Sequence, residues 1–180
     1  MRAQKASGSS GSNGWLLYVA TLAPDEGETV AQVFYKDDPH ELAPKLAPDT
    51  SGFIWMPDEG FANAFAHHAT AEQIALARAV QRPISVNCIQ EPAPKPLWTS
   101  RPSWFLIAEE DRLIHPRTQH FMAERMRATV ELADVDHTPI LMAPDEVVQF
   151  HSCGSEDLVS QGLSSRNFAR IQRSLPGGVW

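Results

Sequence analysis

The chain has 180 residues, of which 43% are hydrophobic and 21% are charged, and its formal net charge is -7. This length and composition are ordinary for one globular domain with a buried core. Acidic and basic residues are interspersed and the balance is acidic, so nucleic acid is not expected as the main partner. The longest apolar run, residues 15–23, is too short to cross a bilayer, so no membrane is expected as a partner.

The N-terminal stretch and the cysteines bear on the compartment. Residues 1–14 are rich in glycine and serine and are expected to form a disordered lead-in. They include basic residues but no apolar segment of the kind that a secretory signal needs. Cys88 and Cys153 are isolated thiols without a CxxC spacing, which favours a reducing compartment. These features predict a cytoplasmic protein.

The first predicted strand is followed by a long segment of different texture. Residues 15–20, WLLYVA, form a nearly continuous apolar run, which is typical of a strand buried on both faces of a parallel sheet. From about residue 28 to 98, prolines recur among scattered aromatic residues. Thr70 and Gln73 provide a capping box there, which predicts a helix over 70–81. The segment is typical of an insertion with its own small helices.

After the insertion the pattern returns to strands and helices. Residues 103–108, SWFLIA, predict a second buried strand, and Pro116 begins a helix that reaches about Arg127. Residues 128–134 alternate like a third strand nearer an edge, and Pro144 begins another helix. This order predicts an α/β fold with about three parallel strands, flanking helices and right-handed crossovers. Residues 151–180 are more polar and are expected to form an irregular or partly helical tail.

Two predicted strands are followed by groups that can move protons. Asp111 comes after the strand 103–108, and His137 comes after the strand 128–134. Because the carboxyl ends of parallel strands meet at one edge of a sheet, the two side chains are expected to lie close together. A carboxylate that holds the Nδ1–H group of an imidazole fixes its tautomer, and the other nitrogen can then accept a proton. Either residue alone is more often structural than catalytic, but the ordered pair favours catalysis.

Other titratable residues compete for these roles or suggest different ones. Glu109 and Glu110 could replace Asp111, and Asp136 could orient the adjacent His137, although an exposed turn carboxylate is its expected role. Four further histidines lack the spacing of metal ligands, since they either adjoin or do not form HExxH: His67, His68, His115 and His120. The pair at 67–68 is expected in a solvated loop. No metal site is expected from these spacings, and no cofactor is expected without a phosphate loop or dinucleotide fingerprint.

Several stretches resemble a known family. The residues WFLIAEEDRLIHP, FMAERM and VDHTPILMAPDEV resemble the C-terminal half of an α/β-hydrolase of the small-esterase and hydroxynitrile-lyase-like branch. WLLYVATLAPDEGE is similar to the strand and loop that follow the nucleophile helix in that branch, and residues 28–98 resemble its cap. The resemblance covers residues 15–150. It implies a partial α/β-hydrolase fold with a mostly helical cap, in which Asp111 is the triad acid and His137 is the general base.

The family nucleophile should precede the first strand. The resemblance implies a serine in a GxSxG turn, and the nearest candidate is the stretch Gly8-Ser9-Ser10-Gly11-Ser12, where serine replaces the last glycine. Four residues separate Ser10 from Trp15, whereas a helical crossover needs at least about 10–12. The nucleophile elbow is therefore expected to be missing from the chain, and a truncated or frame-shifted gene is one hypothesis for this. Little or no autonomous activity is expected.

The function that the resemblance implies is hydrolysis of small carboxylic esters or similar acyl substrates by Ser-His-Asp chemistry. The expected partner is a small hydrophobic ester-like molecule, which the aromatic residues of the cap could contact. Two alternatives stay open: a non-catalytic ligand-binding or scaffold module, and a lyase of the hydroxynitrile-lyase type. The unpaired edge of the strand 15–20 also predicts self-association with another copy of the chain.

Overall fold

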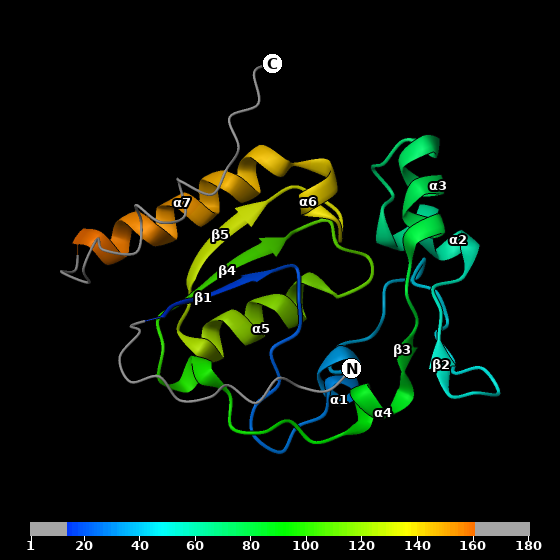
Figure 1. Ribbon diagram of the computed structural model, residues 1–180, viewed down its shortest axis with the longest axis horizontal. Coiled ribbons are helices and arrows are strands. Elements are labelled where there is room, and N and C mark those ends of the chain that lie inside the picture. Colours follow the sequence, from blue (N-terminus) through cyan, green and yellow to red (C-terminus); the bar gives the residue numbers. More distant parts are fainter. Residues whose placement is uncertain (1–13, 161–180) are drawn as a thin grey trace.

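The computed structural model describes residues 14–160, and its centre is a three-stranded parallel sheet between helices (Figure 1). The strands are β1 (Leu16–Val19), β4 (Ser103–Ala108) and β5 (Thr129–Ala133), in the spatial order β1-β4-β5. Tyr18 lies opposite Phe105 in the first parallel pair, and Phe105 lies opposite Val130 in the second. The predicted α/β class with three parallel strands and flanking helices is confirmed.

The central strand separates two hydrophobic cores. The side chains of β4 alternate between the faces of the sheet, as a period of two residues requires. Leu106 packs in the core that includes Phe150 of α7 (Pro144–Ser160), whereas Phe105 packs in the core that includes Met122 of α5 (Pro116–Met126). Figure 1 shows α7 and α5 on opposite sides of the sheet. The short helix α6 (Pro139–Met142) connects β5 to α7.

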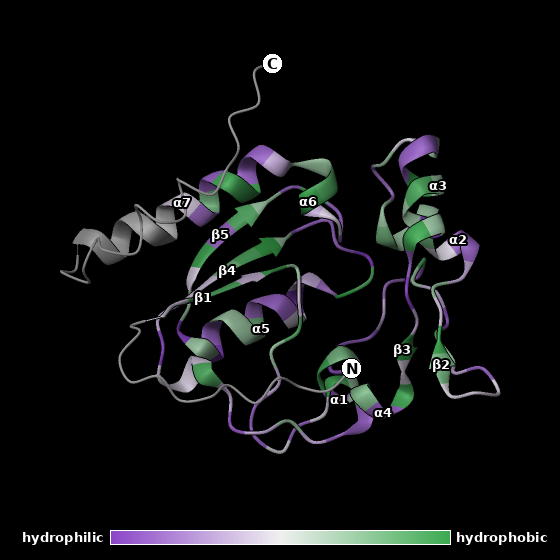
Figure 2. Cartoon of the chain, in the orientation of Figure 1, coloured by the Kyte–Doolittle hydropathy of each residue, from purple (hydrophilic) through white to green (hydrophobic). Residues whose placement is uncertain are grey.

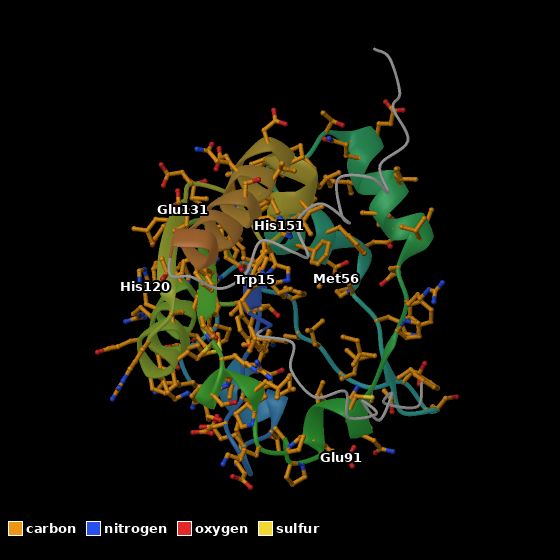
Figure 3. All side chains as sticks on the ribbon, turned by 60° about the vertical axis from the view of Figure 1, so that its left-hand side comes forward. Trp15, Met56, Glu91, His120, Glu131 and His151 are labelled. Atoms are coloured by element: carbon orange, nitrogen blue, oxygen red, sulfur yellow. The ribbon has the colours of Figure 1, made fainter. Side chains whose placement is uncertain are left out.

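The two outer strands are less buried than β4. All four residues of β1 are half-buried, so the prediction of a strand buried on both faces is wrong. The physical reason is that, within residues 14–160, β1 pairs only with β4 and its other edge has no strand. The first four residues of β5 are exposed, and its mixed hydropathy contrasts with that of β4 (Figure 2). On the side of α7, the ring centroids of Trp15 and His151 are 5.1 Å apart, and Figure 3 shows the two residues close together.

The segment 28–98, called the insertion here, lies between β1 and β4, and backbone hydrogen bonds join its start and its end. The Gly27 amide donates to the Ala93 carbonyl at 3.0 Å, and the Ala93 amide donates to the Glu28 carbonyl at 2.8 Å. Its elements are α1 (Val30–Phe34), β2 (Phe53–Ile54), α2 (Asp58–Gly60), the π-helical turn η1 (Phe61–Phe65), α3 (Ala71–Val80), β3 (Ile84–Ser85), α4 (Val86–Gln90) and the 3-10 turn η2 (Leu97–Thr99). The capping box predicted for Thr70 and Gln73 is present at the start of α3.

The ends of the chain were predicted as a lead-in (1–14) and a tail (151–180). Residues 1–13 and 161–180 lie outside the described residues, and the first ten residues of the tail continue α7 to Ser160. Among the residues that the structure describes, no helix has the length and apolar character needed to cross a membrane.

Candidate active site

Backbone hydrogen bonds bring together the loops that follow β4 and β5. Beyond the last paired residues of the strands, the Glu109 amide donates to the Ala133 carbonyl at 2.9 Å. The Glu110 amide then donates to the Val135 carbonyl at 3.2 Å. These bonds extend the pairing of the two strands into their loops. The residues that follow, 111 and 136–137, are therefore held near each other at the carboxyl edge of the sheet.

Asp111 and His137 are in direct contact across this edge. Oδ2 of Asp111 lies 2.8 Å from Nδ1 of His137, and the Asp111 side chain has no exposed surface. An ionised carboxylate can only accept hydrogen bonds, so Nδ1 is the protonated nitrogen of His137 and donates a hydrogen bond to Oδ2 of Asp111. The side chain of His137 is 16% exposed, so it is not completely covered. The structure thus places the two predicted site residues in the geometry that the sequence suggested.

The remaining acceptor capacity of Asp111 is fully used. Its Oδ1 atom accepts from the backbone amides of Leu113 at 2.8 Å and Ile114 at 2.9 Å. Its Oδ2 atom accepts a second hydrogen bond from Nε2 of Gln119 at 2.7 Å. A buried carboxylate is costly unless it is hydrogen-bonded, and four donors meet that requirement here. Three of these donors, Leu113, Ile114 and Gln119, hold the carboxylate in place independently of His137.

Gln119 belongs to the site but is not among the residues predicted from the sequence. Gln119 is fully buried on α5, where its side chain faces the same way as that of Met122. Its Oε1 atom accepts from the Ala108 amide at 3.1 Å, so it links α5 to the end of β4. A polar residue on the apolar face of a predicted helix is the signal that could have found it, because such a residue needs buried partners.

Asp136 is fully buried, so the prediction of an exposed turn carboxylate is wrong. Its Oδ1 atom accepts from the amide and the hydroxyl of Thr138, at 2.8 and 2.6 Å. Its Oδ2 atom accepts from the amide of His68 at 2.9 Å. The turn is covered by the insertion, which contributes His68 from 68 residues earlier in the chain. Asp136 therefore binds Thr138, which follows His137, and His68 of the insertion. It is not the carboxylate that binds the His137 ring.

Glu109 and Glu110, the other candidates for the acid, bind different histidines. Oε1 of Glu109 lies 2.7 Å from Nε2 of His120, and Oε2 of Glu110 lies 2.8 Å from Nε2 of His68. Neither glutamate contacts His137 among the interactions of the described residues. The geometry therefore distinguishes Asp111 from its two neighbours.

An aromatic ring from the insertion lies beside His137. Phe65, at the end of η1, has its ring centroid 5.2 Å from that of His137, with the two planes tilted by 55°. This contact places an apolar surface of the insertion against the imidazole. In the described part of the chain, no hydroxyl or thiol group is hydrogen-bonded to Nε2 of His137. The serines at 9, 10 and 12, the nearest candidates for a nucleophile, lie outside the described residues.

The adjacent histidines 67 and 68 lie in a turn rather than on a helix, and their side chains do not diverge. Their ring centroids are 4.3 Å apart, and Glu110 joins them from the loop after β4. His68 is exposed, as a solvated loop predicts, but both ring nitrogens of His67 are buried. The sequence contained no metal-ligand spacing, yet three groups that can bind a metal ion meet here. The contact depends on tertiary structure, because Glu110 follows His67 by more than forty residues.

The profile of a family described as "Alpha/beta hydrolase family" matches residues 6–150, which is most of the chain. The chain belongs to the alpha/beta hydrolase family. The resemblance in its sequence is therefore confirmed, as is the partial α/β-hydrolase fold. No curated protein matches the sequence.

Solved structures of this hydrolase family share the fold. A polyneuridine aldehyde esterase is 15% identical, with a TM-score of 0.63 over 78% of this chain and 62% of its own. A methylesterase protein from Arabidopsis is 15% identical, with a TM-score of 0.61 over 80% of this chain and 59% of its own. An extracellular alpha/beta-hydrolase from a Paenibacillus species is 17% identical, with a TM-score of 0.59 over 76% and 60%. At these identities the likeness shows the fold alone, and the chain spans less than two thirds of each structure. The cytoplasmic location of this chain stays a prediction.

Proposed function

We propose that Asp111 and His137 are the acid and the general base for hydrolysis of small carboxylic esters or similar acyl compounds. The observation that carries the proposal is the 2.8 Å contact between Oδ2 of Asp111 and Nδ1 of His137 at the end of two parallel strands. Two of the structural neighbours, a polyneuridine aldehyde esterase and a methylesterase, are named for ester chemistry, which supports the choice of reaction.

The roles of the two residues follow from their hydrogen bond. With Nδ1 donating to Asp111, Nε2 of His137 has a free lone pair that accepts the proton of an attacking hydroxyl group. The imidazolium that forms is stabilised by the Asp111 carboxylate, and it then donates the same proton to the departing alkoxide. Such general acid–base catalysis typically contributes about 10²–10⁴-fold to a rate.

The proposal does not assign Ser10 as the nucleophile that His137 activates. The reason is the spacing of residues 8–15, which leaves no room for a crossover helix between Ser10 and the strand that starts near Trp15. The nucleophile proposed for His137 in this chain is therefore water or an added nucleophile, acting without the amides of an elbow turn. Loss of one oxyanion donor alone costs about 10²–10³-fold in a serine hydrolase, so only slow hydrolysis of reactive esters is expected.

Hydrolysis of p-nitrophenyl acetate by the purified chain tests the role of His137, because this activated ester does not require a serine nucleophile. The wild-type chain is expected to exceed the buffer rate, and His137→Ala is expected to return the rate to that of buffer. His120→Ala is the matched control, since His120 also pairs with a glutamate but makes no hydrogen bond to Asp111 or His137 among the interactions of the described residues. Equal rates for the wild type and His137→Ala would contradict the proposal.

A fluorophosphonate probe tests whether any serine of the chain acts as the nucleophile. No stoichiometric labelling of serine is expected at any position of the chain. Labelling of one serine would show that the nucleophile is present, and it would leave the role of His137 to the hydrolysis assay. Binding of an ester-like ligand with neither hydrolysis nor labelling would favour the ligand-binding module over the enzyme.

A further inference from the structure

Three side chains outside the Asp111–His137 pair converge where the insertion meets the sheet. His67 and His68 come from the turn after η1, and Glu110 comes from the loop after β4. One ligand atom from each of the three lies within 4.8 Å of the other two. Nε2 of His68 and Oε2 of Glu110 are 2.8 Å apart, and the two imidazole rings are in edge contact.

His67 is the unusual member of this group. Both of its ring nitrogens are buried; the ring interacts with the backbone of Ala64, but neither nitrogen makes a well-formed hydrogen bond to a described residue. A buried polar atom without a partner costs about 1–3 kcal/mol, so such atoms in native proteins call for a bound water, ion or other group. Burial lowers the pKa of His67, and the charge of Arg112 acts in the same direction. A neutral imidazole with an unused ring nitrogen is the form of histidine that binds metal ions.

We propose that His67, His68 and Glu110 form a binding site for a divalent transition-metal ion, with Zn²⁺ as the best match to the ligand set. Two imidazole nitrogens and one carboxylate oxygen are typical ligands of zinc when three protein groups bind and a fourth position stays open to water. This ligand set excludes Ca²⁺ and Mg²⁺ as good matches, because those ions prefer oxygen ligands.

The distances suit this ion without any change in the backbone. Tetrahedral bonds of about 2.0–2.1 Å place ligand atoms about 3.3 Å apart. The present separations range from 2.8 Å for the His68–Glu110 pair up to the 4.8 Å limit, so rotation of side chains is sufficient. The turn is also anchored, because the buried carboxylate of Asp136 accepts from the His68 amide. Ligands that are held in this way bind with a smaller entropic cost.

The charges near the site act in both directions. Glu110 carries a negative charge that favours a cation, whereas Arg112 lies close enough to His67 to influence its protonation. Arg112 is half-buried, donates to the Asn63 carbonyl at 3.3 Å and is not part of the hydrophobic core, so glutamine can replace it. The site should therefore bind zinc more tightly in Arg112→Gln than in the wild type. That effect is specific to a cation site.

The metal ion would act on the architecture and not on the reacting atoms. His67 and His68 belong to the insertion, and Glu110 adjoins Asp111 in the loop after β4. An ion bound by all three residues would hold the insertion, including Phe65, against the Asp111–His137 pair. This inference does not depend on the proposed hydrolysis, and its test uses no activity measurement.

The test is titration of the full chain with Zn²⁺ by isothermal calorimetry, after metal has been removed with a chelator. One equivalent is expected to bind to the wild type. His67→Ala and Glu110→Gln are each expected to weaken binding by more than about tenfold, since even the loss of an outer-shell partner costs 10–100-fold. Glu110 is half exposed, so its variant does not endanger the fold.

His120→Ala is the matched control for the titration. His120 and Glu109 form a histidine–glutamate pair of the same chemistry at 2.7 Å, but the pair has no third ligand in the described residues. Zinc binding is expected to be unchanged in this variant. The visible absorption of added Co²⁺ gives a second readout, and tetrahedral bands that are lost in Glu110→Gln are expected. A wild-type chain that binds no zinc, or binding that is equally tight in His67→Ala and Glu110→Gln, would overturn the proposal.

Discussion

Gln119 donates a hydrogen bond of 2.7 Å to Oδ2 of Asp111, the same oxygen that accepts from His137. The same amide nitrogen also donates to the Ile114 carbonyl at 3.0 Å, and the amide oxygen accepts from Ala108. One buried amide thus connects the end of β4, the following loop and the start of α5. Gln119 is therefore a positioning residue for Asp111, and it makes no hydrogen bond to the imidazole of His137 among the interactions of the described residues.

Replacing Gln119 by alanine is expected to lower the free energy of unfolding by about 2–4 kcal/mol, because it leaves the buried Ala108 amide and one side of Asp111 without partners. Urea denaturation measures this loss. Gln90→Ala is the control, since Gln90 is exposed on α4 and should tolerate the change. The p-nitrophenyl acetate rate should fall in Gln119→Ala and persist in Gln90→Ala. A variant as stable and as active as the wild type would exclude the positioning role.

Asp136 is the second acidic residue whose removal should be costly. Asp136→Ala leaves the amides of His68 and Thr138 without their acceptor, so the free energy of unfolding should fall by about 2 kcal/mol or more. Asp134→Ala, two residues earlier and exposed, should have little effect. Thermal unfolding of both variants makes the comparison. Equal melting temperatures for the two would contradict the burial of Asp136.

A third prediction concerns the acid response of the turn that leads into β2. Hydrogen bonds from backbone amides, that of Phe53 foremost, lower the pKa of Asp49 below its ordinary value of 3.8. Since the unfolded chain then binds the proton more tightly, the contribution of this turn is complete above pH 3.8 and is lost as the pH falls below it. An NMR titration of the Asp49 carboxyl carbon should give a pKa below 3.8. A value at or above 3.8 would contradict the hydrogen bonds between this carboxylate and the amides of the turn.

The open edge of β1 predicts self-association that depends on concentration. The amides of Leu16 and Ala20 donate toward β4, so the amide of Val19 faces the other edge, where the described residues contain no strand. Val19→Pro removes that donor and should shift the chain toward monomer in sedimentation velocity experiments. Val19→Ala retains the donor and should associate like the wild type. A wild-type chain that is monomeric at every concentration would rule out this interface.

The elements with strong local signals could be predicted from the sequence. The apolar run at 103–108 became the buried strand β4, and the capping box at Thr70 became the start of α3. The pairing of Asp111 with His137 could also be anticipated, because parallel strands bring their carboxyl ends to one edge whatever the intervening sequence. These features depend on short stretches of chain or on a general rule of topology.

The features that the sequence did not predict all depend on contacts between distant segments. Asp136 is buried where it accepts a hydrogen bond from the amide of His68. The group of His67, His68 and Glu110 likewise forms only because the loop after β4 lies beside the insertion. No periodicity encodes how an insertion folds back on a sheet. For the same reason, the strand β1 has the apolar composition of a central strand but is only half-buried. The burial of β1 depends on which segment pairs with its other edge, and the composition of the strand does not specify that segment.

The most direct test of the pairing between Asp111 and His137 is the protonation of the two imidazole nitrogens of His137, read from long-range ¹H–¹⁵N correlations at alkaline pH. The structure predicts a proton on Nδ1 and a bare Nε2 in the wild type, and the same pattern in Asp136→Asn. In Asp111→Asn this preference should be lost, because the carboxylate that fixes the tautomer is gone. A proton on Nε2 in the wild type, or a pattern that Asp111→Asn leaves unchanged, would contradict the assignment of Asp111 and His137 as the acid–base pair.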